Sequence, residues 1–130
     1  MSSWRQRQSE TQAHAREANE SAARACAAAA PAGAPVGSFR CECDDQGCTC
    51  AIKLTLIEYE SVREYATHFV IAPNHENPER ESVVEENERF AVVEAVSGEA
   101  VKRARRSDPR QSPAERSASD RARSGSAIAR

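Results

Sequence analysis

Hydrophobic and polar positions divide the chain into a patterned centre and two ends that lack large apolar residues. Short apolar runs bounded by turn-forming residues predict strands in the centre. These strands are expected at 39–43, 48–52, 68–72, 82–85 and 90–96. The first two flank a tight turn, and the last two are joined through Asn87, which can adopt turn geometry. We therefore expect a cysteine-bearing hairpin and a small antiparallel sheet.

Two short helices complete the predicted centre. The first begins after Thr55, whose side chain can form a capping box with Glu58 three residues later. Helical spacing places Leu56, Tyr59, Val62 and Arg63 on the inward face of this helix. The second is a short basic helix over 99–106 that closes before a proline.

The N-terminal segment is rich in Ala, Glu, Gln and Arg, and its composition predicts a helix. Its apolar face is mostly alanine, so we expect few of its residues to join a core. The predicted organisation is a helix at 1–30, a Pro/Gly-containing linker at 31–38, an α+β domain at 39–108 and a disordered basic tail at 109–130. On this view, both ends can be removed without unfolding the centre.

Charge separates the same regions. Residues 1–40 carry +2, residues 41–100 carry −10 and residues 101–130 carry +6, which sum to the net charge of −2. No stretch reaches the roughly 20 apolar residues needed to cross a membrane, and the first residues lack the apolar run of a secretory signal. We therefore expect a cytoplasmic protein with no membrane contact. In a reducing compartment, clustered cysteines favour metal binding over disulfides.

Four cysteines follow the spacing C-x-C-x4-C-x-C, at Cys41, Cys43, Cys48 and Cys50. On a hairpin all four sulfurs can converge, which suits structural zinc, and Gly47 offers backbone freedom in the turn. Two cross-strand disulfides, free buried thiols and an iron–sulfur cluster fit the same pattern. His75, in a turn after the third strand, is a further candidate ligand. His68 is expected at a strand edge, and His14 in solvent.

Several of these segments resemble a family of small uncharacterised bacterial proteins, found mainly in high-GC Gram-positive bacteria. The similarity lies in F-R-C-E-C-D-D-Q-G-C-T from Phe39, L-T-L-I-E-Y-E-S-V-R from Leu54, A-P-N-H-E from Ala72 and S-D-P-R from Ser107. It spans roughly residues 16–110. The resemblance implies a Cys3His site made of Cys41, Cys43, Cys48 and His75, with Cys50 as a substitute or bystander. It also implies that Asn74 replaces a glycine and adopts left-handed geometry. It implies no activity.

The function expected is that of a non-enzymatic, zinc finger-like domain that acts in regulation or in binding another protein. A domain of about 60 residues buries little apolar area, so a bound metal ion would add stability that the core alone does not provide. The alternative is a nucleic-acid- or ribosome-associated protein that binds through its basic C-terminal tail. An enzyme is disfavoured because no catalytic constellation is visible. For the fourth zinc ligand we prefer His75 to Cys50, because it closes a longer loop and couples metal binding to folding of the whole domain.

Overall fold

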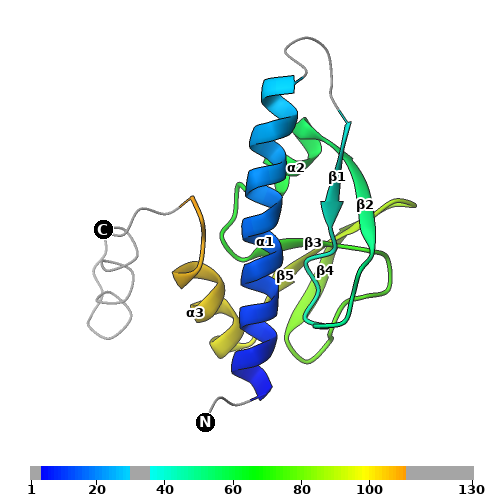
Figure 1. Cartoon of the computed structure of the whole chain (residues 1–130). Coiled ribbons are helices and arrows are strands. Elements are labelled where there is room, and N and C mark those ends of the chain that lie inside the picture. Colours follow the sequence, from blue (N-terminus) through cyan, green and yellow to red (C-terminus); the bar gives the residue numbers. More distant parts are fainter. Residues whose placement is uncertain (1–3, 30–35, 111–130) are drawn as a thin grey trace.

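The structure is a computed structural model that describes residues 4–29 and 36–110. It has the predicted α+β class (Figure 1). The helices are α1 (Trp4–Ala29), α2 (Leu56–Val62) and α3 (Gly98–Arg106). The strands are β1 (Val36–Arg40), β2 (Ala51–Thr55), β3 (His68–Ile71), β4 (Glu81–Glu86) and β5 (Ala91–Ala95). Residues 31–35 of the predicted linker and most of the predicted tail, residues 111–130, lie outside the described residues.

The strands form two antiparallel sheets. β1 pairs with β2, and a second sheet has the order β3-β5-β4. The predicted strands at 68–72, 82–85 and 90–96 are confirmed as β3, β4 and β5. A bulge between Val83 and Glu85 interrupts the pairing of β4 with β5.

The first hairpin is displaced from its predicted position. β1 begins inside the predicted linker, and the ladder runs from Val36 opposite Thr55 to Arg40 opposite Ala51. The reason is that Ile52 and Leu54 alternate on one face of β2 and are buried in the core, 2% and 0% exposed. Burial of these two side chains fixes the register, so the paired residues lie further from the turn than predicted. Residues 41–50, which hold all four clustered cysteines, are therefore a loop and not two strand ends.

Helix α2 has the predicted start. The Thr55 side chain accepts from the Glu58 backbone N–H, and the Glu58 carboxylate accepts from the Thr55 N–H. Tyr59 and Val62 are buried, and the Tyr59 ring stacks on Phe39 with ring centroids 4.7 Å apart. The capping box thus sets where α2 begins and which face it turns to the core.

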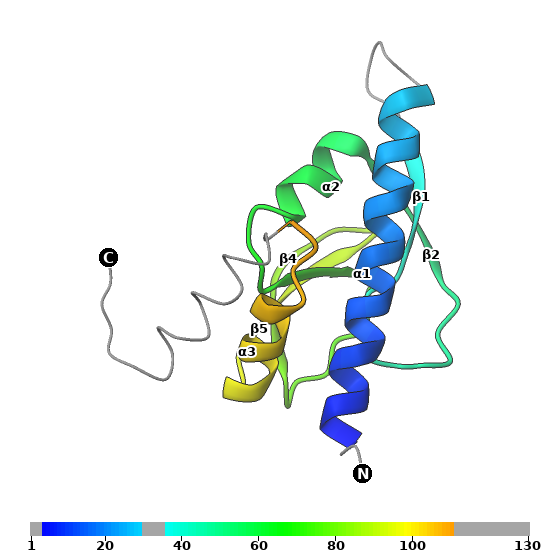
Figure 2. The ribbon, with the colours of Figure 1, turned by 60° about the vertical axis from the view of Figure 1, so that its left-hand side comes forward.

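Only two apolar side chains of α1, Ala15 and Ala23, join the core, yet the helix packs closely against the domain. α1 runs along the length of the molecule and contacts β1, α2 and α3 (Figures 1 and 2). Its buried face is a stripe of mostly polar residues at helical spacing: Ser9, Gln12, Ala15, Arg16, Asn19, Glu20 and Ala23. The polar members of this stripe, among them Gln12, Arg16 and Asn19, form hydrogen bonds to the rest of the domain. Polar contacts therefore hold α1 in place, and these cannot be predicted from the apolar pattern of the helix.

The described C-terminal end is anchored as well. Arg110 pairs with Glu20 of α1 and with Glu60 of α2. The chain therefore leaves the described region beside α2. Within residues 4–29 and 36–110, no helix combines the length and apolar character that crossing a lipid bilayer requires.

Candidate metal centre

The loop between β1 and β2 folds back on itself through a tight turn. The Cys48 N–H donates to the Asp45 carbonyl at 3.0 Å, and the Gly47 N–H donates to the Asp45 side chain at 3.0 Å. This turn brings Cys48 back toward Cys41 and Cys43. Gly47 does not have a left-handed φ, so the turn does not require the conformational freedom that the sequence suggested.

A second turn presents His75. The His75 N–H donates to the Ala72 carbonyl at 3.1 Å, and Asn74 has a φ of 71°. Proline at the second position and a left-handed residue at the third are the pattern of a type II turn. The left-handed conformation expected for Asn74 is therefore confirmed, and the turn directs the His75 ring toward the cysteine loop.

Four of the predicted donors meet at one point. The ligand atoms of Cys41, Cys43, Cys48 and His75 all lie within 4.8 Å of one another. The His75 Nδ1 is 3.4 Å from the Cys41 Sγ and 3.6 Å from the Cys48 Sγ. Zinc–sulfur and zinc–nitrogen bonds of about 2.3 and 2.05 Å at tetrahedral angles place S and N about 3.6 Å apart. The two sulfur–nitrogen distances are close to this value, and the four donors lie near enough to one another to hold a metal ion such as zinc.

Cys50 lies outside this group. Its side chain is exposed, and its Sγ is 4.0 Å from the Nε2 of His75, the ring nitrogen opposite the one that faces Cys41 and Cys48. If Nδ1 binds the metal, Cys50 faces the free ring nitrogen and can accept a weak hydrogen bond from it. Such contacts orient a histidine ligand without adding a ligand.

The other cysteine and histidine residues are elsewhere. His14 is exposed on α1, and His68 is half-buried at the start of β3. Cys26 lies on α1, near Gly37 of β1. All five cysteines are unpaired, so the alternative of two cross-strand disulfides is not what the structure has. The four-thiolate arrangement that an iron–sulfur cluster prefers is not formed either, because Cys50 is outside the group.

The three thiols are electrostatically linked. A hydrogen bond from Cys41 lowers the pKa of Cys43 to about 5, and the same contact raises the pKa of Cys41. Burial raises the pKa of Cys48. Without a cation, one thiolate is stabilised at the expense of its neighbours. A divalent metal removes this conflict because it favours all three thiolates at once.

Backbone N–H groups point at the sulfurs. The Ala72 N–H donates to the Cys41 Sγ at 3.1 Å, the Asp45 N–H to Cys43 and the Cys50 N–H to Cys48. Hydrogen bonds to sulfur stabilise the thiolate form and hold the ligands in place. Each of the three cysteines is thus prepared for metal binding by the backbone around it.

Glu42, between the first two cysteines, fixes the loop from inside the domain. It is fully buried, and its carboxylate accepts from Arg63 at 3.0 Å, from the Val70 N–H at 2.9 Å and from Asn19 at 2.8 Å. Its own N–H donates to the Val70 carbonyl at 2.8 Å. One side chain therefore ties the cysteine loop, residues 41–50, to α1, to the C-cap of α2 and to β3.

The loop that follows His75 is held in the same way. The Asn77 side chain donates to Asp44 at 2.7 Å, which joins the histidine loop to the cysteine loop. Arg80 donates to Ser9 at 2.8 Å and to Gln12 at 3.1 Å on α1. Both loops that supply ligands are therefore anchored by buried polar contacts.

The sequence did not predict this supporting network, although it placed Arg63 on the inward face of the predicted helix; in the structure Arg63 is the C-cap of α2. A signal was present in α1, where polar residues recur every three or four positions. A stripe of that kind indicates a solvent-exposed face unless the buried partners, Glu42 and Arg80, are known. Those partners are far away in the sequence, so the signal was not interpretable from the helix alone.

Comparisons with protein-family models, with curated proteins and with solved structures found no match to this chain. The resemblance to a bacterial family therefore stays a prediction. What stands is the geometry: four donors from two loops that can hold a metal ion such as zinc in a small α+β domain.

Proposed function

We propose that the chain is a non-enzymatic, zinc-stabilised module that acts by binding another protein. One Zn²⁺ is bound by the thiolates of Cys41, Cys43 and Cys48 and by the Nδ1 of His75. The observation that carries the metal assignment is the convergence of these four donor atoms within 4.8 Å. Three sulfurs and one imidazole suit zinc far better than they suit calcium or magnesium, which prefer oxygen ligands.

The role of the metal is structural. Four protein ligands fill a tetrahedral shell, whereas a catalytic zinc keeps one position for water or substrate. The ligands come from the loop after β1 and from the turn after β3, so the ion joins the two sheets. For a domain this small, such a cross-link offsets the limited area that the core can bury.

Removing the metal tests this role. A chelator such as EDTA is expected to abolish cooperative thermal unfolding, measured by circular dichroism, and added zinc is expected to restore it. The Cys26→Ser variant is the matched control, because Cys26 lies outside the ligand group and its loss is expected to leave the chelator response unchanged. A protein that melts at the same temperature with and without chelator contradicts a structural metal.

An interaction role is supported by the charge of the domain. Residues 41–100 carry fourteen acidic and four basic side chains. A surface of that sign suits a basic protein partner and disfavours nucleic acid on the same face.

The second candidate function is nucleic-acid or ribosome binding through the basic C-terminal region. The exposed Lys102 and Arg105 of α3 favour it. Such binding would weaken steeply as the salt concentration rises. A duplex RNA that binds in about 50 mM salt, and whose affinity falls at least roughly tenfold in a Lys102→Gln/Arg105→Gln variant, would support this hypothesis.

A further inference from the structure

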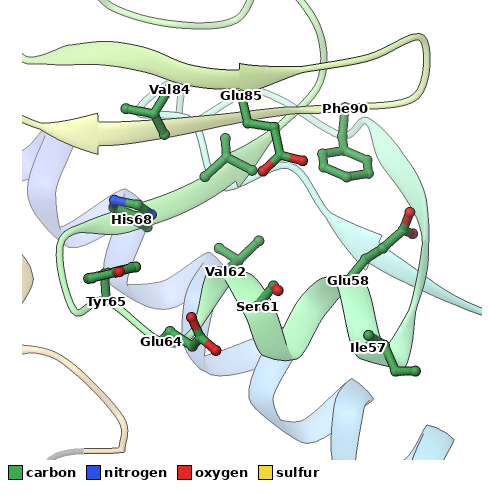
Figure 3. Close-up of a pocket in the computed structure, with 11 residues that line it drawn as sticks. Ile57, Glu58, Ser61, Val62, Glu64, Tyr65, His68, Val84, Glu85 and Phe90 are labelled. Carbon is green, nitrogen blue, oxygen red and sulfur yellow. The ribbon is translucent and has the colours of Figure 1, made fainter.

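A groove lies between α2 and the β3-β5-β4 sheet, away from the metal ligands (Figure 3). Its volume is about 430 Å³. In Figure 3, Val84 of β4 and Phe90, just before β5, point toward α2, and Val62 points back toward them. Tyr65 and His68 form one end of the groove, with their ring centroids 4.6 Å apart.

The floor of the groove is apolar and its rim is exposed. Val62, Phe90 and Val92 on the floor are 3%, 3% and 4% exposed. On the rim, Ile57, Tyr65 and Val84 are 72%, 58% and 48% exposed, and they are three of the six large apolar side chains most exposed in the described residues: Trp4, Val36, Ile57, Tyr65, Val84 and Val96. A site for a small molecule encloses most of its ligand, whereas an open apolar surface of this kind is typical of protein binding.

Val84 owes its exposure to the bulge in β4. The bulge leaves Val84 out of the register with β5, and β4 is one of the two edge strands of its sheet within the described residues. A bulge also makes an edge unsuited to regular pairing with another strand. The groove therefore offers side-chain contacts to a partner more readily than it offers backbone hydrogen bonds.

The charge of the rim is uniformly acidic. Glu64 and Glu85 are exposed, line the groove and have no ion-pair partner among the described residues. The third acidic residue, Glu58, is paired with Arg89. Within the part of the chain that the structure describes, no lysine or arginine lines the groove. Nucleic acid and anionic lipid surfaces are repelled by such a rim, whereas arginine and lysine side chains are attracted.

We propose that this groove binds a segment of a partner protein in which one or two large apolar side chains are flanked by arginine or lysine. The apolar side chains cover Val62, Phe90 and Val92, and the flanking cations reach Glu64 and Glu85. This proposal rests on the interaction role suggested above and deepens it by naming the chemistry of the partner. It does not depend on the metal.

The test uses the full chain, purified with zinc, and a defined probe. The probe is a fluorescein-labelled twelve-residue peptide of leucine, serine and arginine, and its control has glutamate in place of every arginine. Binding is followed by fluorescence anisotropy and mapped by NMR on the ¹⁵N-labelled chain. We expect the arginine peptide to bind and to shift the amides of Tyr65, Val84 and their neighbours, and we expect the glutamate peptide not to bind.

Substitutions distinguish binding in the groove from nonspecific attraction of the peptide to the acidic domain. The Glu64→Gln/Glu85→Gln variant is expected to weaken binding roughly fivefold, because two exposed ion pairs are lost. Val84→Ser is expected to weaken it about tenfold through lost apolar contact. The charge-matched control is Glu10→Gln/Glu17→Gln on the exposed side of α1, which is expected to bind as the unmodified chain does. All three changes are at exposed positions, and their melting temperatures verify that each variant is folded.

Several results would overturn the proposal. One is that the NMR shifts map outside the groove. Another is that the glutamate peptide binds as tightly as the arginine peptide. A third is that the α1 control variant weakens binding as much as the groove variants do. Displacement of the probe by a synthetic peptide of residues 111–130 at similar concentration would show that the chain itself supplies the occupant. A dimer that Val84→Ser dissociates would assign the groove to a second copy. Zinc content is measured on the same samples, so that a chain without zinc can be distinguished from a chain that binds zinc but not the peptide.

Discussion

Replacing Glu42 by alanine is the most informative perturbation of the network behind the metal centre. Glu42 and Arg63 form an ion pair at 3.0 Å in which the two side chains are 0% and 1% exposed. Arg63 already has two buried nitrogens, Nε and Nη1, without a partner among the described residues. Without Glu42, the charge of Arg63 keeps only the His68 carbonyl, at 2.9 Å, as a hydrogen-bond acceptor within the described part of the chain.

The expected cost follows from the groups that lose their partner. Leaving one member of a buried ion pair uncompensated costs about 3–5 kcal/mol. The Val70 N–H also loses its carboxylate acceptor, and an unsatisfied buried donor costs about 1–3 kcal/mol, although the two losses do not add fully. We therefore expect the free energy of unfolding to fall by at least about 4 kcal/mol, against roughly 5–15 kcal/mol for a whole domain. Glu42→Gln retains an acceptor and is expected to lose roughly half as much.

Urea denaturation followed by circular dichroism, with zinc present in excess, measures this loss. Glu99→Ala is the control, because it removes an ion pair with Arg103 that is exposed on α3, and no measurable change is expected. A loss below about 1 kcal/mol for Glu42→Ala would refute the reasoning, because it would mean that the charge of Arg63 does not depend on Glu42.

Three further predictions address other parts of the account. A fragment that begins at Val36 is expected to lose cooperative unfolding by circular dichroism, because it lacks Arg16 and Asn19 of α1; a fragment as stable as the full chain would contradict this. The hydrogen bond from Arg89 lowers the pKa of Glu58 from 4.5 to about 2, so its contribution to stability is present above about pH 4.5 and is lost as the pH falls toward 2. Glu58→Gln can keep the helix cap but not the ion pair, so between pH 4.5 and 2 it is expected to lose less stability than the unmodified chain. Acid titrations in which the two proteins lose stability in parallel would contradict a contribution from the Glu58–Arg89 pair. Finally, Asn74→Ala is expected to lower the melting temperature because of its left-handed φ, whereas Gly47→Ala, where a Cβ meets only an ordinary contact at 3.6 Å, is not; the reverse order would be inconsistent with the two turns.

Local signals were sufficient for much of the fold. The capping box of α2 and the apolar runs of β3, β4 and β5 act over a few residues, and the sequence predicted all four elements. The predicted hairpin is displaced because the alternation of cysteines with polar residues favours strands at 39–43 and 48–52, whereas burial of Ile52 and Leu54 determines where β1 and β2 pair.

The four candidate metal ligands could be predicted from the sequence, whereas the residues that hold them in place could not. Cysteine spacing and the position of His75 after a strand, together with the family resemblance, led to the four donors that the structure brings together. The support from Glu42 and Arg80 was not predictable, because a buried charge becomes favourable only when its distant partners are in place. The contacts that hold α1 against the domain were not predicted for the same reason, since its buried stripe is mostly polar.

The central claim is a Cys3His zinc site, and native mass spectrometry of the chain purified without chelator tests it most directly. We expect one zinc per chain in the unmodified protein and in Cys50→Ser, whose thiol lies 4.0 Å from the outer ring nitrogen of His75. We expect His75→Ala to lose zinc and to melt at a lower temperature. A folded protein without metal, or one with stoichiometric calcium or magnesium, would contradict the claim. So would loss of zinc in Cys50→Ser together with its retention in His75→Ala.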